Sequence, residues 1–237
     1  MHNILKITWL HLFPGLLITL LYVLLAPVVN AAGYPSLMAG MIAFLLVILP
    51  FEWFYLLAKG KQVSGRYSLS AVLPTQPVPL KKRILAISGG ILAIVFIAGG
   101  MQFFDTSIKE ALEQWLPKWY FFDEDYKSGY TKEAIIVTAG LRIVVYGFII
   151  PIVEEQYFRG YLLPKIPATG VKAPMAGSIL FALYHFWQPW NYPSLLLISG
   201  VLVFTAWHFK NYKISLYIHL IINLLGSIAF FLLVSKP

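Results

Sequence analysis

The sequence predicts an all-α, polytopic membrane protein with about seven transmembrane helices around a buried polar site. Of its 237 residues, 59% are hydrophobic and 12% are charged, and the mean hydropathy is +0.75. A soluble domain is usually about a quarter charged, so this chain has too few polar groups to cover itself in water. Apolar stretches of about 20 residues, long enough to cross a bilayer as helices, recur along it, and no β-barrel alternation dominates.

Each apolar stretch predicts one helix. The expected spans are roughly 7–29, 36–58, 84–104, 134–163, 172–189, 192–208 and 213–234. The first is too long for the apolar core of a typical signal peptide and is broken by Pro14 and Pro27, which favours a retained helix. We expect residues 1–129 to form an N-terminal part with about three spans, and residues 130–235 a core domain with about four.

The basic residues predict the orientation. One face of the expected membrane protein carries Lys6, Lys59, Lys61, Arg66, Lys81, Lys82, Arg83, Arg159, Lys165, Lys172, Lys210 and Lys213. The opposite face carries Lys109, Lys118, Lys127, Lys132 and Lys236. The positive-inside rule therefore places the N-terminus and the loop 59–83 in the cytoplasm and the C-terminus outside. The net charge of +8 is then explained by topology, and no nucleic acid partner is expected.

The segment 105–133, between the third and fourth spans, is expected on the outer membrane interface. Ile108, Leu112 and Trp115 recur there at helical spacing and predict a short amphipathic helix. An aromatic run, 119–122, follows as the expected interfacial anchor, and an acidic run, 123–125, comes after it.

Two adjacent carboxylates lie deep in the fourth span. Glu154 and Glu155 are about 15–17 Å along the helix from its cytoplasmic end, where a charge costs about 2.5–3.5 kcal/mol or more. Arg159 is four residues after Glu155, so the two can pair on one helical face. Glu154 points about 100° away and is freer to act as a general base. Pro151 should kink or open the helix one turn earlier. The alternative is a structural ion pair with a spare carboxylate.

Other polar residues share faces on two further helices. Phe181 and His185 lie on one face of the fifth span, and His219 and Asn223 on one face of the seventh. Tilt could bring these side chains to the glutamates in the inner half of the membrane. Taken singly, each histidine is explained about equally well as an interhelical hydrogen-bonding group. Interfacial placement is expected for Glu52, near the inner end of its span, and for His2, His11 and His208, near span ends.

Three motifs occur in a fixed order: Glu154-Glu155-x-x-x-Arg159, Phe181-x-x-x-His185 and His219-x-x-x-Asn223. Together, on apolar helices, they resemble the CPBP family, also called the Abi family. It contains the type II CAAX prenyl endopeptidases and bacteriocin-processing or immunity-linked membrane proteins. Each motif is loose alone, whereas three in order at this depth are specific. The motif region covers about 154–223 and the family core about 130–235.

The resemblance implies intramembrane peptide-bond hydrolysis. By this resemblance, Glu154 deprotonates a water with help from His185, and His219 and Asn223 stabilise the oxyanion. Glu155 and Arg159 hold the helix and the base in place, and an exchange of roles between the two glutamates stays open. Phe181 is expected to support the site. The chain has no cysteine, and Ser178 is a weak candidate for a nucleophile, so activated water is the simpler proposal.

The metal question stays open on sequence alone. Glu154, His185 and His219 form a set that zinc accepts, with a fourth position for water. The family is often labelled as metalloproteases, while a metal-free, glutamate-activated water is the alternative. The chain lacks the HExxH zinc motif.

The expected partners are the lipid bilayer and a membrane-associated peptide or protein substrate, including lipidated ones. We expect a prokaryotic cell membrane and a site that opens to the cytoplasmic side. Two other functions remain: a catalytically idle interaction or immunity protein on the same scaffold, and a proton-coupled transporter that uses the same buried groups as a relay.

Overall fold

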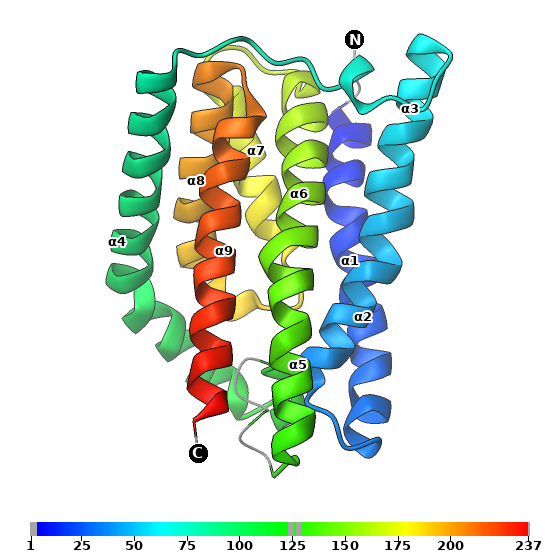
Figure 1. Cartoon of the computed structure of the whole chain (residues 1–237), viewed down its shortest axis with the longest axis vertical. Coiled ribbons are helices and arrows are strands. Elements are labelled where there is room, and N and C mark those ends of the chain that lie inside the picture. The colour runs from blue at the N-terminus through cyan, green and yellow to red at the C-terminus, as the bar shows by residue number, and fades with distance from the viewer. Residues whose placement is uncertain (1–3, 123–125, 127–128, 237) are drawn as a thin grey trace.

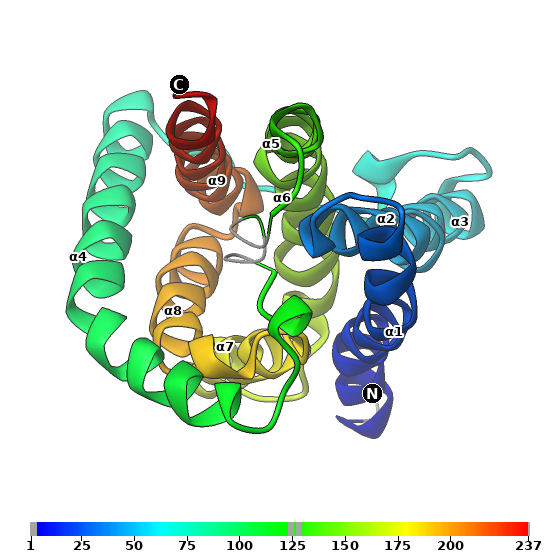
Figure 2. The ribbon, with the colours of Figure 1, turned by 90° about the horizontal axis from the view of Figure 1, so that it is seen from below.

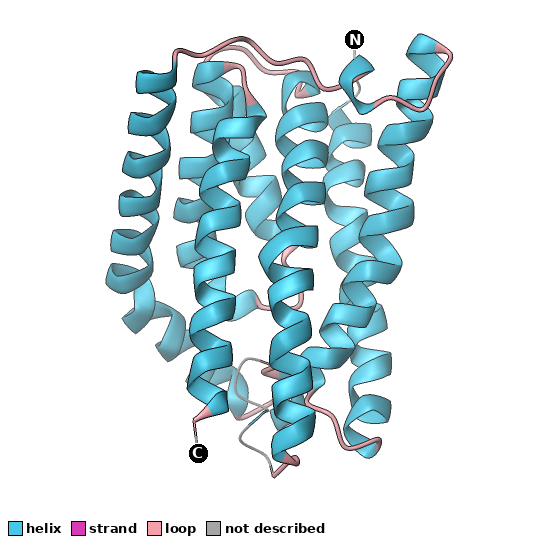
Figure 3. Cartoon of the chain, in the orientation of Figure 1, coloured by secondary structure: helices cyan, strands magenta, loops and turns pink. Residues whose placement is uncertain are grey.

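The computed structural model describes residues 4–122, 126 and 129–236, and in these residues it contains helices and loops but no strand (Figure 1, Figure 3). The α-helices are α1 (Ile4–Ala31), α2 (Ser36–Ile48), α3 (Tyr55–Ser64), α4 (Leu80–Glu113), α5 (Lys132–Val144), α6 (Ile150–Glu154), α7 (Lys172–Tyr184), α8 (Tyr192–Phe209) and α9 (Tyr212–Ser235). The predicted all-α fold is confirmed.

Three π-helical segments interrupt the α-helices without ending them. Leu49–Phe54 joins α2 to α3, Val145–Ile149 joins α5 to α6, and Glu155–Leu162 continues α6 toward a short 3₁₀ turn, Leu163–Lys165. Pro50 lies in the first segment, and Pro151 follows the second by two residues. Proline removes a backbone donor and crowds the preceding turn, and π-helical turns are frequent at functional sites. The disturbance expected at Pro151 therefore takes the form of a π-helical turn.

Six helical stretches in the described part of the chain are long and apolar enough to cross a membrane. They are Ile4–Ala31, Ser36–Ser64, Leu80–Glu113, Lys132–Lys165, Pro189–Phe209 and Tyr212–Ser235. They confirm a polytopic membrane protein. The expected span 172–189 differs, because α7 has only 13 residues and ends at Tyr184. At about 20 Å it is shorter than the hydrocarbon core of about 30 Å.

The end of α7 has a local cause. His185 leaves the helical conformation, with φ −81° and ψ 51°, and its Nδ1 donates to the backbone oxygen of Phe181 at 2.8 Å. That bond occupies one of the carbonyls that a helix end leaves without a partner. Pro189 disfavours helix at Gln188, which is non-helical with φ −140° and ψ 60°. As a result, α7 and α8 form a hairpin whose turn, 185–191, lies above the lower ends of α5 and α9 in Figure 1.

The N-terminal helices pack directly on the helices that carry the motifs. α1 contacts α2 and α7, α2 contacts α6, and α4 contacts α8 and α9. Seen from below in Figure 2, α5 and α6 lie near the middle, α1 and α2 lie on one side, and α4 curves round α8 and α9 on the other. The division into parts 1–129 and 130–235 stays a prediction.

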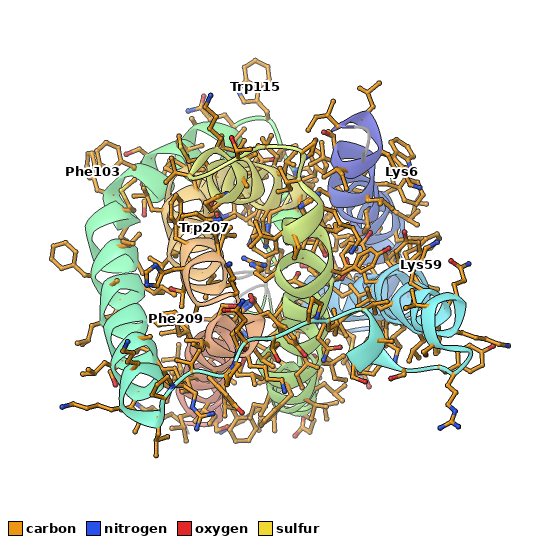
Figure 4. The ribbon with its side chains drawn as sticks, turned by 90° about the horizontal axis from the view of Figure 1, so that it is seen from above. Lys6, Lys59, Phe103, Trp115, Trp207 and Phe209 are labelled. Carbon is orange, nitrogen blue, oxygen red and sulfur yellow. The ribbon has the colours of Figure 1, made fainter. Side chains whose placement is uncertain are left out.

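The segment after residue 104 differs from the amphipathic helix that the sequence predicts. α4 continues to Glu113, so Ile108 and Leu112 belong to the same long helix as the third span. Trp115 follows its end, is 84% exposed and, like Phe103, points away from the bundle in Figure 4. The acidic run 123–125 lies outside the described residues.

The aromatic run packs against protein rather than serving as an exposed anchor. The hydroxyl group of Tyr22 on α1 donates to the backbone oxygen of Trp119 at 2.5 Å. Phe121 and Phe122 are buried against Trp190 in the turn between α7 and α8. The spacing of apolar residues and a run of aromatic ones cannot distinguish an interfacial aromatic side chain from one that fills the end of a helical bundle.

Close helix packing at Gly15 gives a first testable prediction. A Cβ at this position of α1 would overlap the backbone oxygen of Tyr184 at the end of α7. Gly15→Ala is therefore expected to lower the free energy of unfolding by about 1–3 kcal/mol, as overpacking does. Its thermal midpoint in detergent should be compared with that of Gly99→Ala, since an added Cβ at Gly99 meets nothing within 4 Å. Equal midpoints would contradict the contact.

Candidate active site

The carboxylate of Glu155 is buried and held by three side chains. The Ser215 hydroxyl donates to Oε2 at 2.6 Å, and His219 Nδ1 donates to Oε1 at 2.9 Å. Arg159 Nη1 lies 3.4 Å from Oε1, and the side chains of this ion pair are 0% exposed. The predicted pairing of Glu155 with Arg159 is thus present. Because a buried carboxylate needs partners for both oxygens, these contacts make Glu155 a fixed anchor.

Phe181 supports the same anchor from α7. The guanidinium carbon of Arg159 lies 3.7 Å from the centre of the Phe181 ring, a cation–π arrangement. The Phe181 ring also meets the ring of His185 edge-on at 4.8 Å. Phe181 therefore lies between the ion pair and His185.

Sequence reasoning missed Ser215. It lies four residues before His219 on α9, so both side chains occupy the face that meets Glu155. This spacing was a usable signal. A serine in an apolar helix carries little information by itself, because its hydroxyl often bonds to its own backbone. Here it bonds both to the backbone oxygen of Tyr212 and to Glu155.

Glu154 has different surroundings from its neighbour. It is 2% exposed and lines a cavity of about 510 Å³, together with His185, His219 and Asn223. The motif residues from three separate helices thus reach one cavity, as predicted. Glu154 is the last residue of α6 and Glu155 is the first residue of the next π-helical segment. The two side chains therefore project from the point where the helix changes from α to π geometry. One carboxylate is fixed, and the other faces an open volume.

The hydrogen bonds of the two histidines leave the same ring nitrogen available on each. His185 Nδ1 bonds to a backbone oxygen and His219 Nδ1 to a carboxylate, and both partners only accept, so each Nδ1 carries a proton. Nε2 is the nitrogen left for a ligand. Asn223 uses one amide hydrogen on the backbone oxygen of Tyr146 at 3.1 Å and keeps the second.

A metal site formed by Glu154, His185 and His219 stays a prediction. Among the residues that the structure describes, no three histidine, aspartate or glutamate side chains form a group that could hold one. Glu154, His185 and His219 share a cavity wall without forming such a group. We therefore route no chemical step through a metal.

Two residues expected at the membrane interface lie inside the protein. Glu52 is 0% exposed and accepts a hydrogen bond from the Tyr184 hydroxyl at 3.4 Å. His11 is 1% exposed, with its ring 5.5 Å from that of Phe158. The sequence gives the depth of a residue along its helix but not the direction of the face, and these faces meet the motif helices.

The cavity around Glu154 extends toward the end of the bundle that holds the C-terminus. Its lining includes Arg142, Phe122 and Asn191, from the outer half of the predicted topology. At the lysine-rich end, a second cavity of about 590 Å³ reaches Arg159 and is bordered by Trp207, labelled in Figure 4. An opening to the cytoplasm stays a prediction.

Comparison with known proteins agrees with the motifs. Residues 136–225 match the family described as type II CAAX prenyl endopeptidase Rce1-like. The chain is 33% identical over 89 residues to the UPF0177 protein YxdF of Lactococcus lactis subsp. lactis (strain IL1403), and this match covers 38% of the chain and 50% of the relative. The chain thus spans about half the length of that relative.

No solved structure matches the chain. The segment that matches the family runs from α5 into α9 and contains all three motifs, from Glu154 to Asn223. The match over residues 136–225 therefore confirms the resemblance to the CPBP family that the motifs predict, on the side of its Rce1-like type II CAAX prenyl endopeptidases.

Proposed function

We propose that the protein is an intramembrane endopeptidase that hydrolyses a peptide bond with a water activated by Glu154. The observation that carries this proposal is the unequal environment of the two adjacent glutamates. Glu155 is held by three side chains, whereas Glu154 faces the cavity beside two histidines and an amide. A carboxylate that acts as a general base must be able to contact a water, as the cavity allows Glu154 to do. A purely structural Glu155–Arg159 ion pair would not need a cavity beside it.

In the proposed reaction, Glu154 takes a proton from a water in the cavity, and the resulting hydroxide attacks the carbonyl carbon of the substrate. His185 Nε2 accepts a hydrogen bond from the same water and orients it. The proton on Glu154 then passes to the amide nitrogen as the C–N bond breaks. The products are a carboxylic acid and an amine, and Glu154 returns to its starting state.

The oxyanion that forms during attack requires donors placed in advance. Asn223 offers its second amide hydrogen. His219 can donate from Nε2 only when it carries two protons, because Nδ1 already donates to Glu155. The Glu155 carboxylate holds the ring through Nδ1, and Arg159 and Ser215 hold the carboxylate in position. Glu155 thus acts through His219.

The substrate that fits this site is a peptide or protein held in or at the membrane, including lipidated ones. The cavity lies between membrane-spanning helices, and its wall includes Ile94 and Ala98 of α4, so a substrate segment would meet apolar side chains. The family match supports a peptide substrate, and the bacterial source of the relative supports a prokaryotic cell membrane.

A cleavage assay with the detergent-solubilised protein tests the proposal. A fluorogenic peptide library with and without lipidated members is expected to yield a cleaved peptide, and a chelator should leave its turnover unchanged. Loss of turnover with the chelator and recovery with zinc would show that a metal takes part. The enzymatic proposal would fail if no peptide were cleaved while Glu154→Ala and His185→Ala still complemented a deletion strain. That outcome would favour an interaction or immunity protein.

A further inference from the structure

Arg142 is a charged residue of a membrane-spanning stretch that the proposed reaction does not use. It lies on α5, ten residues after Lys132 and therefore about 15 Å along the stretch Lys132–Lys165. It belongs to none of the three motifs. A cation at such a depth is costly, usually faces the interior of the bundle or a cavity, and usually has a function. Its surroundings indicate what it can bind.

Arg142 borders the same cavity as the proposed base. Arg142, Tyr146, Ile150 and Glu154 recur at intervals of four residues along one continuous helical stretch, and all four line the cavity of about 510 Å³. In a regular α-helix, residues twelve apart point about 120° away from each other. The π-helical segment Val145–Ile149 lies between Arg142 and Glu154, and its wider turn holds more residues. This segment therefore helps to place the cation and the base on one wall.

The guanidinium group of Arg142 keeps hydrogen-bond donors for a ligand. Its Cζ lies 4.6 Å from the centre of the Phe230 ring on α9, a cation–π contact that uses no acceptor oxygen. Among the described residues, no acceptor bonds to Nε and no carboxylate forms an ion pair with Arg142. The five N–H donors of an arginine form a planar fork that matches a carboxylate. An anionic group that enters the cavity therefore meets available donors.

We propose that Arg142 binds a carboxylate of the substrate and thereby selects which peptide bond reaches Glu154. The proposal rests on the proposed function and adds a specificity residue to it. Twelve residues of helix separate Arg142 from Glu154, a rise of about 18 Å. An extended peptide spans about 3.3–3.6 Å per residue, so the bound carboxylate lies about five residues from the scissile bond. It is either the end of the substrate chain or the side chain of an acidic residue.

A purely structural role for Arg142 makes a different prediction. A cation that only packs on Phe230 would affect stability, and its removal would change the cleavage of every peptide by the same factor. A cation that binds a substrate carboxylate affects only the peptides that carry this group. The comparison of matched acidic and neutral peptides therefore separates the two roles.

The cleavage experiment uses the peptide found in the library, in two matched pairs. One pair differs in a free or amidated chain end, and the other, amidated at its end, carries glutamate or glutamine about five residues from the cleaved bond. In at least one pair, the wild-type protein should cleave the carboxylate form with a kcat/KM about 10- to 100-fold higher, as expected for a hydrogen bond to a charged group. The pair that shows the preference identifies the source of the carboxylate.

The variants assign this preference to one side chain. Arg142→Gln should lose it, mainly through KM, and should cleave the neutral peptides as the wild-type protein does. Arg142→Glu should instead prefer a peptide with lysine at the same place. Lys132→Gln is the matched control, because it removes a charge from an exposed position of the same helix that does not line the cavity. Its preference should equal that of the wild-type protein.

A second readout needs no cleavage. Dansyl-labelled alanine pentapeptides with a free end, with an amidated end, or with a final glutamate before an amidated end are titrated into detergent-solubilised Glu154→Gln protein, with and without Arg142→Gln. Fluorescence anisotropy gives the dissociation constants. At least one carboxylate peptide should bind about 10-fold more tightly than the neutral one, and Arg142→Gln should remove the difference.

The two readouts separate the failure of this proposal from the failure of the proposed function. If the wild-type protein cleaves no peptide but the difference in binding is present, the proposed function fails and the carboxylate site remains. Equal binding of the three peptides, no binding of any of them, or a difference that persists in Arg142→Gln would overturn the role of Arg142.

Discussion

Glu154→Gln is expected to lower kcat by about 10²- to 10⁴-fold while the protein keeps its fold. Glutamine has the shape of glutamate but cannot take a proton from water. The change leaves the Glu155 contacts with Arg159, His219 and Ser215 intact, so the thermal midpoint should stay close to that of the wild-type protein. Single-turnover cleavage of the peptide found in the library measures the effect on the chemical step.

Glu133→Gln is the matched control for this prediction. It is the same substitution on the same continuous helical stretch, 132–165, but at an exposed position in the first turn of α5. Its kcat should equal that of the wild-type protein. If Glu154→Gln kept its turnover and Glu155→Gln lost it, the roles of the two glutamates would be exchanged.

Arg159→Met is expected to lower the free energy of unfolding by about 3–5 kcal/mol, the usual cost of leaving a buried charge without its partner. Glu155 would remain fully buried beside Ser215 and His219 with no guanidinium. Loss of the cation–π contact with Phe181 adds to the effect. Denaturation of the purified protein in detergent measures the change.

A double variant separates stability from catalysis. Glu155→Met combined with Arg159→Met removes both charges, and apolar replacement of a buried pair is often neutral or stabilising, so most of the lost stability should return. Activity should not return, because His219 has lost the carboxylate that holds its ring in position. Arg66→Met, at an exposed loop position, should change stability by less than about 0.5 kcal/mol. A double variant as unstable as Arg159→Met would show that other contacts dominate.

Local patterns in the sequence predict much of the site. The Glu155–Arg159 pair follows from a spacing of four residues on one helix, and long apolar runs predict six of the membrane-spanning stretches. The convergence of Glu154, His185 and His219 on one cavity was predicted from their depth in three helices. Depth can be counted along a helix, and for this reason these expectations succeed.

Features that depend on the direction of a helical face could not be read in the same way. Glu52 and His11 were placed at the interface because of their position along a span, yet both face other helices. Pro189 is a local signal for a helix end near this position, but the apolar residues before it favoured a longer span, 172–189. The set of residues that line the cavity depends on how α4, α8 and the aromatic run pack, and no local pattern encodes that packing.

The α7–α8 hairpin has a consequence for mapping the chain across the bilayer. Both helices join the rest of the protein at the lysine-rich end, so the hairpin adds either two crossings or none. The relative sides of the two chain ends are the same in both cases, and reporters fused to those ends give identical signals. A probe inside the turn 185–191 would show whether the hairpin crosses the bilayer. Because the natural chain has no cysteine, one thiol introduced there would be the sole site for a membrane-impermeant maleimide.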